Sequence, residues 1–144
     1  MNNVLKVLAV SALSLSSAST FAASQTFDAT LEVKQAISMV KTSDLDFGII
    51  TTDNTTDIVI AQNDAGAAAF TVSGEAGDSV SVAIANTNLV NGANTIAAEF
   101  DFINALTLTG GNADLKIGGT ARTSSATLVA GTYTANVSVD ITYQ

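Results

Sequence analysis

Carboxylates and lysines are the main candidates for acid–base or metal chemistry in this sequence, because the chain contains no His and no Cys. Without an imidazole, no Ser can join a Ser–His–Asp triad, and the usual nitrogen and sulfur ligands of zinc are missing. Asp44 and Asp46 stand two positions apart and share one face if this stretch is extended, which is a pairing that glycosidases could use. Their place beside Phe47 and Gly48 favours a turn or a strand end instead.

Two further groups of polar residues are candidate chemical sites. The oxygen-rich stretch 53–57 could hold Ca²⁺, but it lacks the spacing, the Gly and the terminal Glu of an EF-hand loop, so we expect an exposed turn. Lys34, Lys41 and Lys116 are isolated in the sequence and are expected to be solvated rather than to act as bases. The residues therefore predict no catalytic group, no metal and no cofactor, and hence a protein that is not an enzyme.

Composition limits the classes of partner. The chain has 144 residues, 5 Lys and Arg against 13 Asp and Glu, and a net charge of −8. This balance argues against nucleic-acid binding and disfavours anionic membrane surfaces, which both need clustered cations. The apolar fraction of 47% is enough for one folded core, and no apolar run reaches the length of a membrane span, so we expect no membrane insertion.

The beginning of the chain has the features of an export signal. A short cation-bearing start is followed by the apolar run 7–15 and by small residues up to Ala22. We predict that residues 1–22 are a signal peptide, with Ala18 and Ala23 as alternative cleavage points. Export without any Cys means that packing or a partner, rather than disulfides, must stabilise the domain.

The rest of the chain is predicted to be β throughout. From Tyr133 to Tyr143 every second residue is apolar or aromatic, which places one face of a strand in a core and the other in water. Gly118 and Gly119 are not followed by the Lys and helix of a phosphate loop, and we predict a turn there. The same alternation recurs between turn signals at Ile58/Ile60, Phe70/Val72, Val80–Ile84, Ile96–Phe102, Leu106/Leu108, Leu115/Ile117 and Leu128. Such spacing predicts a sandwich or barrel of about seven strands.

An apolar stripe also marks the arm that precedes this domain, residues 23–34. Phe27, Ala29, Leu31 and Val33 lie on one face of the strand that this pattern predicts. Two binding sites for this arm are possible. The arm is the first strand of its own sheet, or it adds as a strand to a groove on another copy.

The end of the chain resembles a known pattern. Gly131 opens the last alternating strand and Tyr143 is penultimate, which is similar to the C-terminal signature of chaperone–usher pilus subunits. The stretches Leu45–Ile50, Ala68–Gly74 and Ala130–Tyr133 also resemble an uncharacterised family of Ala/Gly/Thr-rich secreted bacterial β-domains. The chain departs from the best-known pilus subunits in having no disulfide and no Gly within the apolar stripe.

This resemblance implies an all-β, immunoglobulin-like sandwich at 35–144 whose incomplete sheet is complemented by an N-terminal donor strand. It implies a structural subunit (pilin) of a surface fibre that polymerises by donor-strand exchange and serves adhesion or biofilm formation. The implied partners are other copies or related subunits, a periplasmic chaperone and an outer-membrane usher, with export through the periplasm to the cell surface or the extracellular space. The donor residues would be Phe27, Ala29, Leu31 and Val33, and the acceptor groove and C-terminal strand would use Gly131, Tyr133, Val137, Val139, Ile141 and Tyr143. The alternatives are a self-contained secreted sandwich that binds surface glycans, and an extracellular matrix or amyloid-like protein.

Overall fold

A computed structural model describes residues 22–144, so the predicted signal peptide lies outside the described residues except for Ala22 and stays a prediction. The chain divides into two units, 1–32 and 33–144. In the first unit, residues 22–32 are exposed and belong to no strand, with Phe27 and Leu31 exposed by 90% and 88%. Because no described residue of this arm is assigned to a strand, the strand predicted there stays a prediction.

The second unit consists of strands, and no helix occurs among the described residues. The nine strands are β1 (Ser38–Ser43), β2 (Ile58–Ile60), β3 (Ala68–Ser73), β4 (Ser79–Ile84), β5 (Thr87–Asn91), β6 (Asn94–Phe102), β7 (Ala105–Thr107), β8 (Asn112–Ala121) and β9 (Val139–Tyr143). The all-β sandwich that the sequence predicts is confirmed, with nine strands in place of about seven.

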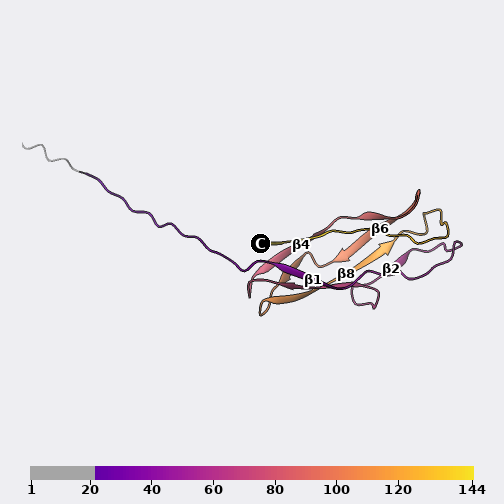
Figure 1. Cartoon of the computed structure of the whole chain (residues 1–144), viewed down its shortest axis with the longest axis horizontal. Helices are drawn as coiled ribbons and strands as arrows, with labels where there is room; N and C mark the ends of the chain where they lie inside the picture. The colour runs from indigo at the N-terminus through magenta and orange to yellow at the C-terminus, as the bar shows by residue number, and fades with distance from the viewer. Residues whose placement is uncertain (1–21) are drawn as a thin grey trace, which may run out of the picture. The chain divides into compact units, whose positions relative to one another are not determined.

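Two antiparallel sheets face each other. One has the order β1-β3-β8-β6-β5, with β2 pairing β8 beyond the end of β3, and the other has the order β7-β4-β9. Figure 1 shows β4 and the chain end on one side of the domain and β1 and β8 on the other. The core fills the space between the sheets, where Val72, Val80, Leu108 and Leu115 are fully buried. Burying each such side chain contributes about 1.5–3 kcal/mol.

The paired glycines of β8 correct one sequence prediction. Gly118 and Gly119 lie inside the strand and not in a turn. A Cβ on Gly118 would meet the carbonyl oxygen of Ile60 and would lie 2.9 Å from the backbone nitrogen of Gln62. A Cβ on Gly119 would lie 3.1 Å from Leu45. These glycines therefore serve close approach of neighbouring segments to the sheet.

Candidate functional site: a groove between two unpaired strand edges

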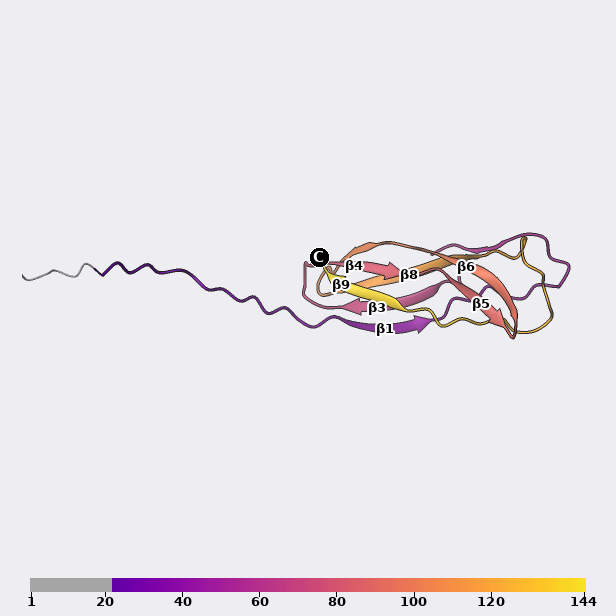
Figure 2. The same cartoon turned by 90° about the horizontal axis from the view of Figure 1, so that it is seen from above.

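Strands β1 and β9 each pair on one side only. Within the described chain, β1 pairs only with β3, and β9 pairs only with β4. Figure 2 shows β1 along one margin of the domain, running opposite to β9. Both strands border one groove with a volume of about 1030 Å³. Each free edge presents a row of backbone N–H and C=O groups.

The first wall of the groove is β1 and the loop that follows it, up to Thr52. Met39 and Lys41 of β1 line the groove, and the neighbouring Val40 is 66% exposed. The N–H of Asp46 donates to the carbonyl of Gly66 over 2.8 Å, which ties the loop to the sheet.

The second wall is the extended segment 128–137 together with Val139 of β9. One backbone pair holds this segment: Val90 N–H donates to the Thr134 carbonyl over 2.8 Å, and Thr134 N–H donates back over 3.1 Å. Gly131 has φ 146°, and a Cβ there would collide with the side chain of Asn91. The bend that begins this wall therefore requires glycine.

The floor of the groove is apolar. Its side chains come from β3, β4, β5, β6 and β8, and they include Ala68, Phe70, Ile84, Leu89, Ile96, Phe100 and Ile117. A strand placed over this floor would direct every second side chain toward it.

Tyr143 links the chain segments that lie beyond the groove at the end where β1 begins. Its hydroxyl donates to the carbonyl of Gln35 over 2.6 Å and accepts from the N–H of Glu75 over 2.7 Å. The ammonium of Lys34 lies 5.6 Å from the centre of the Tyr143 ring and pairs with Asp78 over 2.5 Å. These contacts join the end of β9 to the segment before β1.

The loop that continues the first wall beyond β1, residues 44–52, has mixed chemistry. Ile49 is fully exposed, and Ile50 beside it is 38% exposed. Gly48 adopts φ 79°, and its N–H donates to a carboxylate oxygen of Asp46 over 2.8 Å. Lys41 pairs with Asp44 over 2.6 Å. This part of the first wall therefore carries both exposed apolar side chains and carboxylates.

A second charged cluster lies around Arg122, which follows β8. Its guanidinium pairs with Glu99 over 2.6 Å and with Asp57 over 3.1 Å. Hydrogen bonds from Ser124 and then from Arg122 hold the pKa of Asp57 below its ordinary value, and Arg122 does the same for the pKa of Glu99. Each charged group of this cluster has a partner within it, with one guanidinium shared by two carboxylates, and the cluster joins β6, the end of β8 and the segment before β2.

The predicted site residues divide into three groups. Four of the predicted acceptor residues line the groove, namely Gly131, Tyr133, Val137 and Val139. Ile141 and Tyr143 instead pack against the hydrophobic core. The predicted donor residues Phe27, Ala29, Leu31 and Val33 are exposed and lie in no strand.

The sequence reasoning missed the first wall and the floor of the groove. The apolar pair Ile49-Ile50 after Gly48 was a visible signal for the loop of the first wall. The floor carries no such local signal, because its residues come together only through strand pairing.

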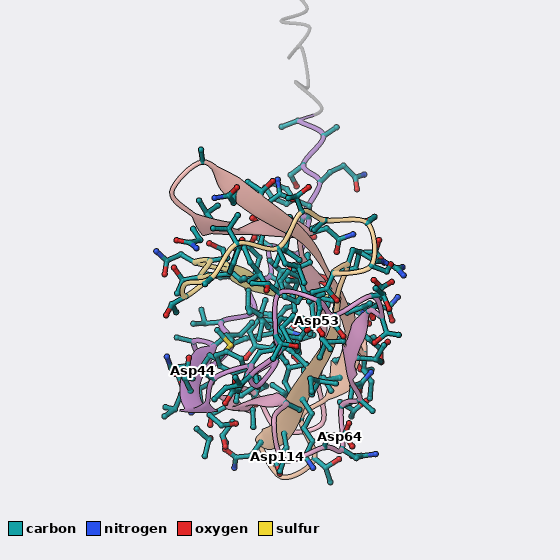
Figure 3. The ribbon with its side chains drawn as sticks, turned by 90° about the vertical axis from the view of Figure 1, so that its right-hand side faces the viewer. Asp44, Asp53, Asp64 and Asp114 are labelled. Carbon is teal, nitrogen blue, oxygen red and sulfur yellow. The ribbon has the colours of Figure 1, made fainter. Side chains whose placement is uncertain are left out.

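Asp44 and Asp46, the carboxylates considered as a glycosidase pair, make structural contacts instead. Asp46 accepts a hydrogen bond from the N–H of Gly48 within its own turn. Asp44 pairs with Lys41, so the favoured turn or strand-end reading describes both carboxylates better than a glycosidase pair. In Figure 3 Asp44 lies at the lower left of the domain and Asp114 lies near its bottom edge. Among residues 22–144, no three His, Cys, Asp or Glu side chains gather as metal ligands.

No helix in this part of the chain has the length and apolar character needed to cross a membrane.

Comparison with known proteins gives one match. The family model of the gill-associated viral 3C-like peptidase matches residues 9–139, which is most of the chain. The match begins within the segment predicted to be a signal peptide. No curated protein and no solved structure matches the chain.

This match corrects the functional predictions. It contradicts the resemblance to chaperone–usher pilus subunits, and with it the roles in fimbriae, adhesion and biofilm and the partnership with further subunits, a chaperone and an usher. The prediction that the chain is not an enzyme is contradicted as well, and the glycan-binding and matrix alternatives gain no support. The predictions failed because alternating strands and a terminal Gly–Tyr pattern are compatible with many antiparallel β-domains. The chain belongs to the gill-associated viral 3C-like peptidase family.

Proposed function

We propose that this protein recognises an extended polypeptide segment, which lies in the groove and adds as a strand to its unpaired edges. The observation that carries the proposal is the apolar groove bordered by the free edges of β1 and β9. Strand addition supplies main-chain hydrogen bonds from the edge and specificity from alternate side-chain positions. The family is named for a peptidase, and a peptidase must hold a polypeptide.

The dimensions of the first wall set the size of the bound segment. Strand β1 has six residues, which at about 3.3 Å per residue span about 20 Å. A bound segment of about six residues therefore matches this edge, with every second side chain over the apolar floor.

Recognition is the part of a peptidase's work that this groove supports directly. The common peptidase pairings of Ser or Cys with an imidazole need a His, and the chain has neither His nor Cys. Hydrolysis by this chain would have to use its oxygen and amine groups. Of those at the groove, Ser43 donates to a backbone carbonyl and Lys41 is paired with Asp44.

A library of random short peptides displayed on phage tests the proposal. We expect the retained sequences to carry apolar residues at every second position. Met39→Glu places a charge on the groove side of β1 and should weaken binding of a retained peptide at least about tenfold, because a carboxylate loses water when the ligand covers it. Mass spectrometry of the incubated peptide shows whether recognition is followed by cleavage.

Val40→Glu is the matched control, since it introduces the same charge one residue along on the exposed face of the same strand. Binding should survive this change. If no sequence is enriched, or if both variants lose binding equally while remaining folded by circular dichroism, the groove is not the recognition site.

A further inference from the structure

Aromatic side chains gather at the groove rather than in the core of the sandwich. The chain has six Phe and two Tyr, and of these eight only Phe21 and Phe27 precede residue 33. Four of the remaining six line the groove, namely Phe47, Phe70, Phe100 and Tyr133. The buried apolar residues of the core are instead all Ala, Val, Ile or Leu, and the aromatic residues of the sandwich are half-buried. The rings at the groove therefore keep apolar surface that a ligand can cover.

Two of these rings lie at the same level of the sheet, next to Gly119 of β8. Gly119 pairs with Phe100 in the neighbouring strand β6, so the two positions share one face. A Cβ on Gly119 would lie 3.2 Å from Cζ of Phe47, which the loop after β1 carries. The missing side chain therefore gives the Phe47 ring room to lie against the sheet at the level of Phe100.

The other two rings extend this surface to both walls of the groove. Phe70 of β3 pairs with Lys41 of β1, so its ring belongs to the floor beside the first wall. Tyr133 belongs to the second wall, where its hydroxyl accepts a hydrogen bond from the N–H of Val129 over 3.1 Å. Met39 lines the groove as well. Phe, Tyr and Met are the side chains that protein-binding surfaces concentrate at their centres.

Resting on the function proposed above, we propose that the groove selects an extended polypeptide with an aromatic side chain among its alternate apolar positions. This side chain lies over the floor, against the rings of Phe47 and Phe100. Aromatic rings attract one another edge to face or in offset stacks, beyond the effect of the area that they bury. An aliphatic side chain of equal size covers the same area and lacks this attraction. The floor residues and the second wall, residues 128–139, contain no Asp, Glu, Lys or Arg, so a ring placed there removes no charge from water.

Three neutral peptides test this inference. They share the sequence Thr-Val-Thr-X-Thr-Val-Thr, in which X is Phe, cyclohexylalanine or Val, and which presents the same order of side chains in either chain direction. Cyclohexylalanine has about the size of Phe without its π-system, so burial of area alone would make it bind at least as well as Phe. By isothermal titration calorimetry we expect the Phe peptide to bind about twofold to tenfold more tightly than the cyclohexylalanine peptide, as aromatic pairs do. The Val peptide should bind most weakly, because it covers the least apolar area.

Variants of single rings locate the effect. In Phe47→Leu and in Phe100→Leu, the ratio of the affinities for the Phe and cyclohexylalanine peptides should fall toward one. Phe102→Leu is the matched control, because Phe102 lies two positions further along the same strand, packs against the core and does not line the groove. This control should keep the ratio of the parent protein. A ratio of two affinities is the readout because a general loss of stability lowers both affinities and leaves the ratio unchanged. Phe47 is carried by a loop, so Phe47→Leu tests the ring even if Phe100→Leu unfolds the sheet.

Each outcome decides a separate point. Equal or tighter binding of the cyclohexylalanine peptide, an unchanged ratio in Phe47→Leu, or an equal fall of the ratio in Phe102→Leu overturns the aromatic selection while recognition of extended peptides stands. Failure of all three peptides to bind, together with an unenriched phage library, overturns the proposed function itself.

Discussion

Replacing Tyr143 by Phe removes one oxygen atom that joins three parts of the chain. The hydroxyl donates to the carbonyl of Gln35 over 2.6 Å and accepts from the N–H of Glu75 over 2.7 Å. The variant keeps the ring, and with it the packing on the core and the contact with Lys34 at 5.6 Å. The change therefore isolates the two hydrogen bonds.

The magnitude follows from the surroundings of the two partners. A hydrogen bond contributes about 0.5–1.5 kcal/mol net, so losing two costs at most about 3 kcal/mol. Gln35 is exposed, and water can replace its lost partner, whereas the N–H of Glu75 is half-buried. We therefore expect Tyr143→Phe to lower the free energy of unfolding by about 1–2 kcal/mol.

Urea unfolding followed by circular dichroism measures this loss as a lower midpoint at an unchanged slope. Tyr133→Phe is the control, because that hydroxyl accepts a single hydrogen bond, from the exposed Val129 over 3.1 Å. Its loss should be below about 1 kcal/mol. If Tyr143→Phe is within about 0.5 kcal/mol of the parent protein, or if the control costs as much, the tie between β9 and the segment before β1 does not stabilise the domain as argued.

Two other variants probe the acid cluster and the core. Arg122→Gln should reduce the loss of stability that the parent protein shows in acid. In the parent, the pKa values of Asp57 and Glu99 are lowered by folding, so the unfolded chain binds more protons than the folded one. The stabilisation from these two carboxylates is therefore lost as the pH falls from about 4.5 through their folded pKa values. Urea midpoints between pH 7 and pH 3 measure this, and parallel curves for variant and parent would contradict it. Leu115→Ala, at a fully buried position, should cost about 2–5 kcal/mol, whereas Leu31→Ala, 88% exposed, should stay within about 0.5 kcal/mol in the same urea assay. Equal losses at the two positions would show that the arm is packed in solution.

Local alternation was enough to predict most of the strands. In β4 and β9, the face that a side chain takes depends only on its place in the strand, so Val80, Val82 and Ile141 could be oriented from the sequence. Strand β5 was missed because Thr87–Asn91 has little apolar alternation of its own and depends on its pairing with β6.

The same local pattern failed where a partner strand decides the structure. Phe27–Val33 alternates as clearly as β9, yet it belongs to no strand among the described residues. Alternation specifies which side chains share a face and says nothing about which strand will pair with the backbone. Gly118 and Gly119 failed for a related reason, because their role depends on the approach of β2 and Leu45, which are distant in sequence.

The groove could be predicted only in part for topological reasons. Its second wall was predicted through Val137 and Val139, because the terminal strand is a strong local signal. Its first wall depends on the placement of β1 at one end of a sheet, and the floor depends on the order β3-β8-β6. Neither the order of strands nor the position of an edge is encoded in a window of a few residues.

The free edges also bear on which occupant the groove can take. An unpaired strand edge beside an apolar groove can pair with another chain, and natural proteins protect such edges with charges, bulges or a covering segment. Here β1 has a register shift between Lys41 and Ser43, and the Lys41–Asp44 pair lies at the same place, so the last part of that edge is both bent and charged. The part of β1 before Lys41 carries neither protection. A ligand strand should therefore form its most regular main-chain hydrogen bonds along the Ser38–Val40 part of this edge. Binding of a retained peptide should therefore persist at high salt, whereas Met39→Glu should weaken it at least about tenfold at any salt concentration.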